Sequence, residues 1–232
     1  MLKKSIIPSL FTSLLFLSVY HGCASAIPTF GTLMPEKGKY QGGARGDFIF
    51  DRDFKDFDEA GTSAYHYTAS YGFTDWFALD GMIGLGDVVS ELTGEKEIRH
   101  HFGFSGGYGF RAKLYEKKNH NLNWVAGFQH MSTHPPNEYY AGRQRDIIWD
   151  EWQFSTTASL GVWRFTPYCG LKWSFAYLIY KIDHDRHRRL SNGPPVGLVV
   201  GTDFKILDYI HLNAEGRFFD ETGLNAGFTI KY

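Results

Sequence analysis

The segment Gln129-His130-Met131-Ser132 contains the residue types of a nucleophilic hydrolysis site. Side chains two residues apart on an extended strand point to the same face, so His130 and Ser132 stand side by side there. An imidazole in that position can take the proton of a serine hydroxyl and activate its oxygen for attack on an ester carbonyl. The spacing therefore predicts acyl-ester hydrolysis, with Ser132 as the nucleophile and His130 as the general base.

A third residue that orients His130 would have to come from the following strand. Gln144 stands at a suitable separation along the chain, while Asp146 and Asp150 have the parity of Trp152, which we expect on the same face as His130. We take Asp146 as the third catalytic residue and keep Asp150 and Gln144 as alternatives. The sequence assigns no oxyanion donor, and we predict no cofactor.

Two other functions fit the same segment. His130, His134 and Glu138 are possible metal ligands, although their four-residue spacing suits a helix better than a strand. Alternatively, His130 and Ser132 are polar residues of a membrane interface that contact only lipid headgroups. Both alternatives stay open on the sequence alone.

The element that carries the segment is one of many with a two-residue period. The C-terminal residues alternate between apolar and polar types, with Leu224, Ala226, Phe228, Ile230 and Tyr232 on one face. The same alternation recurs upstream in about ten segments, an even number as in single-chain membrane barrels. Beyond the first residues, no apolar run is long enough for a membrane-spanning helix. We therefore predict an all-β fold, a closed antiparallel transmembrane β-barrel of about ten strands.

The opposite parity collects charges of both signs, which the barrel would turn inwards. A barrel of this size has an interior that side chains nearly fill, so these residues predict a paired ionic network in a narrow lumen. A selective pore is the alternative. The predicted inward residues are Arg45, Asp47, His66, Asp80, Arg111, Lys113, Lys172, Asp203, Glu215 and Arg217.

The N-terminus has the pattern of a secretory signal peptide. Lys3 and Lys4 precede an apolar stretch, and Ala24-Ser25-Ala26 provides a cleavage site. We predict a signal peptide at 1–26 and the barrel at 27–232, with acylation at Cys23 as an alternative. The formal net charge of −1 indicates neither a nucleic-acid-binding protein nor a polybasic membrane-surface protein.

The lengths of the connections predict the orientation. Short turns at 72–75, 164–167 and 207–209 alternate with long polar stretches at 51–61, 88–100, 133–146 and 181–195. Outer-membrane barrels have short periplasmic turns and longer external loops. Both termini are therefore expected in the periplasm.

Several resemblances follow from these residues. The C-terminal strand ending on Tyr232 resembles the signal that Gram-negative outer-membrane barrels present to the barrel-assembly machinery. The segment from Gly127 to Ser132 resembles the catalytic strand of outer membrane phospholipase A, and its His-x-Ser pair resembles that of lipid A 3-O-deacylase. Both resemblances imply a bacterial outer-membrane location, a lipid-facing site and an outer-leaflet phospholipid or lipid A as the substrate. The phospholipase also implies calcium, which no carboxylate cluster here demands.

Two further resemblances imply other functions. The stretch from His130 to Tyr139 is similar to His-x-Ser-Ser-His-x-Gly-Asp-Glu-Tyr in an uncharacterised outer-membrane family, which implies no activity. Asp185-Arg186-His187 resembles the Asp-x-His pair of omptin proteases, but of their second Asp pair only Asp87 lies nearby. We expect instead a basic loop that binds lipopolysaccharide phosphates through Arg186, Arg188 and Arg189.

Overall fold

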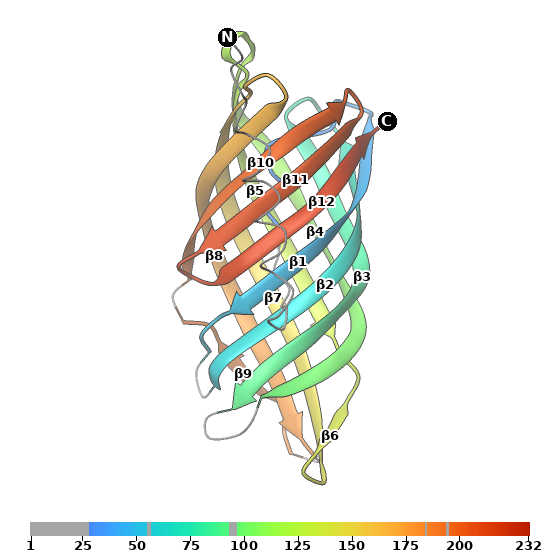
Figure 1. The fold of residues 1–232 in the computed structure, drawn as a ribbon, viewed down its shortest axis with the longest axis vertical. Coiled ribbons are helices and arrows are strands. Elements are labelled where there is room, and N and C mark those ends of the chain that lie inside the picture. Colours follow the sequence, from blue (N-terminus) through green and yellow to red (C-terminus); the bar gives the residue numbers. More distant parts are fainter. Residues whose placement is uncertain (1–27, 55–56, 93–96, 184, 194) are drawn as a thin grey trace, which may run out of the picture.

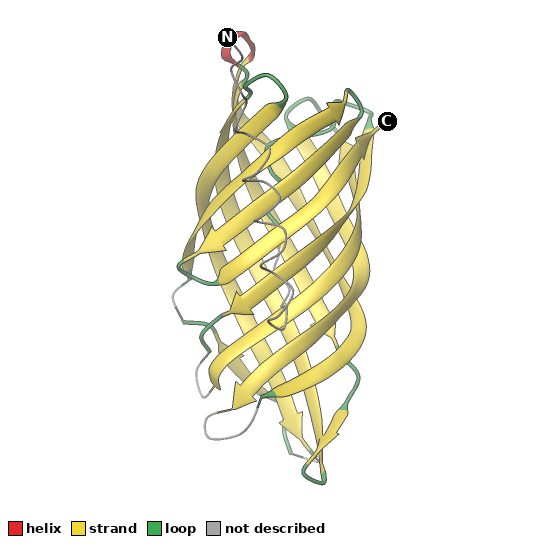
Figure 2. Ribbon diagram, viewed as in Figure 1, coloured by secondary structure: helices red, strands yellow, loops and turns green. Residues whose placement is uncertain are grey.

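The computed structural model describes residues 28–54, 57–92, 97–183, 185–193 and 195–232. Within these residues the chain forms a closed antiparallel β-barrel (Figures 1 and 2), which confirms the predicted fold. Ten strands form its wall, and β7 (Arg143–Leu160) pairs with β8 (Phe165–Ile182) to close it. The predicted signal peptide, with Cys23, lies outside the described residues. The other wall strands are β1 (Tyr40–Asp51), β2 (Phe57–Gly72), β3 (Phe77–Leu92), β4 (Ile98–Lys117), β5 (Leu122–His134), β10 (Val196–Leu207), β11 (Ile210–Phe218) and β12 (Thr222–Lys231).

Two short strands extend the wall at one end. β6 (Glu138–Tyr140) pairs with β7, and β9 (Arg188–Ser191) pairs with β8. Both lie in the longer connections, which gather at the end of the barrel that is lowest in Figure 1. A 3-10 helix, Lys118–His120, lies in the turn between β4 and β5 at the other end, where β1 begins and β12 finishes.

The side chains of the wall strands alternate between the lumen and the outside, as predicted. On β5, Gln129, Met131 and Thr133 are fully buried in the lumen, whereas Trp124 is about half exposed on the outer wall. The exposed apolar residues of the other strands share the outward parity. In the described part of the chain, no helix is long and apolar enough to cross a membrane.

Apolar side chains fill part of the lumen toward the end with the long connections. Trp149 and Ile49 are fully buried there, and Phe54, from the connection after β1, packs edge-to-face on Trp149 at 5.1 Å between ring centroids. Phe54 therefore belongs to the apolar cluster of the lumen although it follows the end of β1. Met131 and Leu178 belong to the same apolar cluster.

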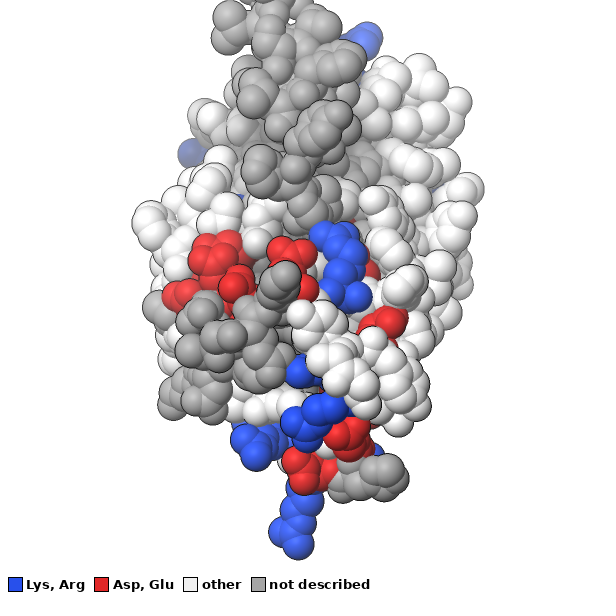
Figure 3. Space-filling view, turned by 60° about the horizontal axis from the view of Figure 1, so that its bottom comes forward, with Lys and Arg blue, Asp and Glu red and all other residues white. Residues whose placement is uncertain are grey.

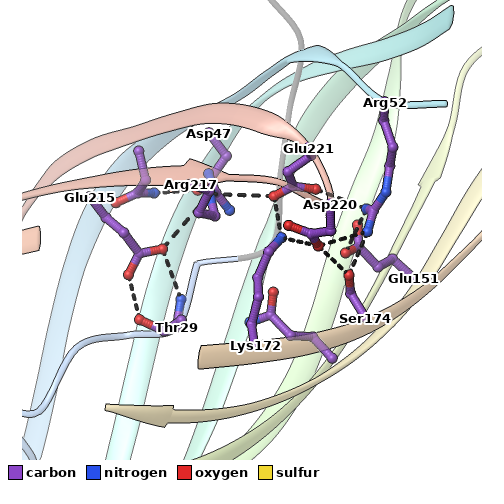
Figure 4. Close-up of polar contacts among 12 residues, drawn as sticks. Thr29, Asp47, Arg52, Glu151, Lys172, Ser174, Glu215, Arg217, Asp220 and Glu221 are labelled. Carbon is purple, nitrogen blue, oxygen red and sulfur yellow. Dashed lines mark hydrogen bonds and ion pairs between the residues drawn. The ribbon is translucent and has the colours of Figure 1, made fainter. Parts of the chain in front are cut away.

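Charged residues fill the next layer of the lumen (Figure 4), which confirms the predicted ionic network. Arg52 lies 2.8 Å from Glu151, 2.9 Å from Glu221 and 3.2 Å from Asp220. Lys172 contacts both Asp220 and Glu221, and all of these side chains are fully buried. Because Asp220 and Glu221 belong to the connection between β11 and β12, that connection turns into the barrel.

The segment that precedes β1 occupies the lumen near the short turns, which the sequence did not predict. Residues 28–32 are buried, and Thr29 donates from its backbone N–H and its hydroxyl to Glu215. Thr32 is 2.7 Å from the Ser159 hydroxyl. Arg111 donates to the carbonyl oxygens of Phe30 at 2.7 Å and Leu33 at 2.8 Å. A cavity of only about 20 Å³ lies beside this segment, so the segment packs closely inside the lumen.

Candidate functional site

His130 and Ser132 lie on the outer wall of the barrel, as the alternation predicts. β5 pairs with β4 on one side and with β7 on the other, so that His130 lies opposite Tyr108 and Trp152. Ser132 lies opposite Gly106 and Asp150 in the next outward row. The site is therefore a patch of three adjacent strands whose side chains face away from the lumen.

The acidic partner of His130 is Asp150 and not Asp146. The Nε2 atom of His130 lies 2.8 Å from Oδ1 of Asp150, and both side chains are less than one-fifth exposed. Asp146 precedes Asp150 by four residues on β7, and lies about 13 Å further along the extended strand. The last pair between β5 and β7 joins Thr133 to Trp149, so Asp146 lies beyond the end of β5. The prediction of Asp146 as the orienting residue is therefore corrected to Asp150.

Ser132 contacts His134 and not His130. The Ser132 hydroxyl lies 2.8 Å from Nε2 of His134 and 3.3 Å from the carbonyl oxygen of Trp149. The Nδ1 atom of His130 is buried and has no hydrogen-bond partner among the described residues. The structure thus contains a Ser132–His134 pair and a separate His130–Asp150 pair, where the sequence predicts one Ser132–His130–Asp146 constellation.

The sequence contains a signal that could have identified His134 as a partner of Ser132, because a histidine stands on each side of the serine. His130 and His134 lie two residues before and after Ser132, and both have outward parity. Parity alone cannot decide between them, because the choice depends on the side-chain torsions of Ser132 and of the two imidazoles. The exposed His134 ring is the one that meets the hydroxyl.

Aromatic rings enclose His130. Its imidazole lies 4.2 Å from the Trp152 ring and 5.1 Å from the Tyr108 ring, measured between centroids. Phe128, which precedes it on the outward face, contacts Trp152 and Phe154. The pair of His130 and Asp150 therefore lies in an aromatic surface that limits its access to water.

The other predicted site residues lie with different partners. The Gln144 backbone N–H donates to Asp183. His187 lies 3.6 Å from Asp146, whereas Asp87 is buried with Ser63 and Arg99. The structure therefore gives no pairing of Asp87 with Asp185 and His187 of the kind that an omptin-like site would need.

The three predicted metal ligands, His130, His134 and Glu138, each contact a different residue. Glu138 accepts hydrogen bonds from the backbone and the ring of His101, while His130 contacts Asp150 and His134 contacts Ser132. Among the described residues, no group of three or more His, Cys, Asp or Glu side chains is arranged to hold a metal ion.

The chain is similar to known outer-membrane proteins in its fold and not in its sequence. No family model matches the chain, and no curated protein matches it significantly in sequence. The crystal structure of the outer membrane protease OmpT from Escherichia coli is similar over 84% of this chain and 94% of that chain, with 9% identity and a TM-score of 0.43. The outer membrane protein OprG from Pseudomonas aeruginosa is similar over 86% of this chain and 98% of its own, with 11% identity and a TM-score of 0.42.

The transport unit of the autotransporter AIDA-I from Escherichia coli is a third similar structure. It covers 84% of this chain and 89% of that chain at 12% identity, with a TM-score of 0.39. At these levels of identity the similarity concerns the barrel fold alone.

Proposed function

We propose that the chain is an integral β-barrel of the bacterial outer membrane that hydrolyses an acyl ester of an outer-leaflet lipid at Ser132. The closed barrel and its apolar outer wall support the membrane location, because each wall strand among the described residues is paired with a neighbouring strand on both sides. The short turns lie at the end of the barrel where β1 begins and β12 finishes. Outer-membrane barrels have their short turns in the periplasm, which supports a periplasmic position of both termini.

The depth of the site in this orientation follows from counting along β5. A tilted transmembrane strand needs about 9–11 residues. If the lipid-facing part begins at the exposed Trp124, it ends between Ser132 and His134. The serine hydroxyl then lies at the boundary of the outer leaflet, which is the depth of the ester groups of membrane lipids.

The observation that carries the proposal is the 2.8 Å contact between the Ser132 hydroxyl and Nε2 of His134 on the outer wall. His134 accepts the serine proton as Oγ attacks the ester carbonyl, and then returns it to the departing alcohol as the ester C–O bond breaks. The same imidazole next deprotonates a water molecule that attacks the acyl-enzyme. The imidazole then returns this proton to Ser132 Oγ as the acyl C–O bond breaks, so that the serine is restored and the products are the fatty acid and the alcohol. The substrate reaches the wall laterally from the membrane.

The two histidines give the proposal a sharp test of mechanism. The resemblance to the phospholipase implies His130 as the base, whereas the hydrogen bond favours His134. We expect His134→Ala to abolish fatty-acid release and His130→Ala to reduce it less. The reverse order would return the role of base to His130, with Asp150 as its partner.

The activity itself is tested by fatty-acid release from phospholipid and from lipopolysaccharide in detergent. We expect release by the wild type and none by Ser132→Ala, and labelling of the wild type alone by a fluorophosphonate. Ser105→Ala is the matched control, because Ser105 is a lumen-facing serine on the neighbouring strand and should still allow labelling. Equal release by the wild type and Ser132→Ala would reject the hydrolase.

A noncatalytic surface barrel is the second candidate function. The close packing of His130 between Tyr108 and Trp152 favours it, because polar and aromatic side chains also gather at membrane interfaces without catalysis. In that case no serine labels and no lipid is cleaved. A pore is not favoured, since residues 28–32 lie inside the lumen and bond Glu215, Ser159 and Arg111, and we expect no conductance of the wild type in planar bilayers.

A further inference from the structure

The end of the barrel with the long connections carries charge of different sign in different sectors (Figure 3). Glu59, Glu91 and Glu97 line a depression at the ends of β2, β3 and β4, with Arg99 beside them. Exposed basic side chains occupy the sector of β7, β8 and β9. They are Arg143, Arg186, Arg188 and Arg189.

Arg189 differs from the other basic residues of this sector in how it is held. Its guanidinium lies over the Tyr177 ring, 3.6 Å from the centroid, although the side chain is 55% exposed. β9 places it opposite Ile179, on the outward face of β8. This contact with the ring face restricts the movement of the guanidinium.

The donors of Arg189 are largely unused. Among the described residues its polar partner is Asp150, and the distance of 3.7 Å between Nη2 and Oδ2 is too long for a hydrogen bond. An Arg side chain has five N–H donors in a planar fork that matches the oxygens of a phosphate. Oδ1 of Asp150 already lies 2.8 Å from Nε2 of His130, so the carboxylate is not dedicated to Arg189.

Arg189 lies on the same outward surface as the candidate nucleophile. Asp150 is opposite Ser132 on one side and Tyr177 on the other, in a single outward row across β5, β7 and β8. Neighbouring strands are about 4.8 Å apart, so the row from Ser132 to Tyr177 spans about 10 Å. A diacyl lipid places its phosphate within a few bonds of its acyl esters, a separation of this order.

We propose that Arg189, stacked on Tyr177, binds the phosphate of the lipid whose ester meets Ser132. This inference rests on the proposed function and names its substrate class, a lipid with a phosphate ester headgroup. The phosphate accepts hydrogen bonds from the guanidinium fork, and the acyl chains lie along the apolar wall below. The shared chemistry is found in glycerophospholipids and in phosphorylated lipid A.

The test measures lipid binding by native mass spectrometry from maltoside micelles, which contain no phosphate. All variants carry Ser132→Ala, so that binding is measured without turnover and can fail independently of the hydrolase. The probes are phosphatidylglycerol, diphosphoryl lipid A and, as the lipid without phosphate, diacylglycerol. Arg189→Gln should weaken binding of a phosphate-bearing lipid about tenfold and leave diacylglycerol binding unchanged.

Two variants serve as controls. Arg143→Gln removes the same charge from the same sector, where Arg143 already bonds Asp183 at 2.9 Å, and it should bind like the parent. Arg189→Lys keeps the charge but loses the planar fork, and should recover only part of the affinity. The probe that responds to Arg189 identifies the source of the phosphate. Equal binding by the parent and Arg189→Gln, or an equal loss in Arg143→Gln, would overturn the proposal.

Discussion

Arg111 inside the barrel and Arg189 on its outer wall differ in how their N–H donors are used. Arg111 in the lumen bonds both oxygens of Asp80 at 2.9 Å, and also the carbonyl oxygens of Phe30 and Leu33. Arg189 on the outer wall stacks on an aromatic ring and has one distant carboxylate. A buried charge must be paired in order to be tolerated, and Arg111 meets this requirement through Asp80.

The serines show the same difference. Ser105 in the lumen is fully buried and bonds His66 at 2.9 Å and Thr133 at 2.8 Å. Ser132, two residues from the end of β5, bonds an exposed histidine. The comparison indicates that the polar groups of the lumen stabilise the barrel, while those of the outer wall are available for a ligand.

The largest effect expected from this comparison is at Arg111. Arg111→Ala leaves the Asp80 carboxylate without its guanidinium in the lumen and releases two backbone carbonyls of the segment before β1. We expect a loss of about 3–5 kcal/mol in the free energy of unfolding. Urea unfolding in lipid vesicles, followed by tryptophan fluorescence, measures it.

The double variant Arg111→Met with Asp80→Leu is the control for this prediction. Replacing both partners by apolar side chains removes the unpaired charge, so the double variant should be more stable than Arg111→Ala. If Arg111→Ala unfolds at the urea concentration of the wild type, the lumen pairs do not stabilise the barrel.

The next effect compares the two serines. Ser105→Ala leaves His66 without its hydroxyl partner in the lumen and should cost about 1–3 kcal/mol of stability. Ser132→Ala should cost less than about 0.5 kcal/mol, because its partner is exposed and can bond to other groups. The same unfolding assay measures both. Similar losses in the two variants would remove the distinction between a structural lumen and an available outer wall.

The barrel itself could be predicted from the sequence. Lipid on one side and a polar lumen on the other require apolar and polar side chains to alternate along every wall strand. The outward positions of His130 and Ser132 follow from the same rule. So do the inward positions of Arg111 and Lys172, which the structure pairs with carboxylates.

The partners within the site could not be predicted in the same way. Whether Asp146 or Asp150 reaches His130 depends on the register of β7 against β5, and the long connection that contains β6 does not reveal it. The buried position of residues 28–32 was also beyond the sequence, since this stretch has no period and contacts residues that are distant in the sequence, such as Arg111 and Glu215.

The smallest effect is expected at the start of β6, where Glu138 pairs with the exposed His101. Burial acts to raise the pKa of Glu138, but hydrogen bonds from the backbone and ring of His101 outweigh it and hold the pKa below its ordinary value. The pair therefore stabilises the start of β6 when the pH is above the ordinary pKa of a glutamate. This contribution is lost as the pH falls through the lowered pKa of Glu138.

Glu138→Gln tests this contribution. Because the His101 side chain is 81% exposed, solvent screening should limit the effect to less than about 0.5 kcal/mol, and the barrel as a whole should not change in stability. Hydrogen exchange at the His101 amide, which donates to Glu138, should be faster in the variant at neutral pH and equal to the wild type in acid. If the exchange rates still differ in acid, the charge of the Glu138 carboxylate does not order the start of β6. The pair would then act like the structural contacts of the lumen.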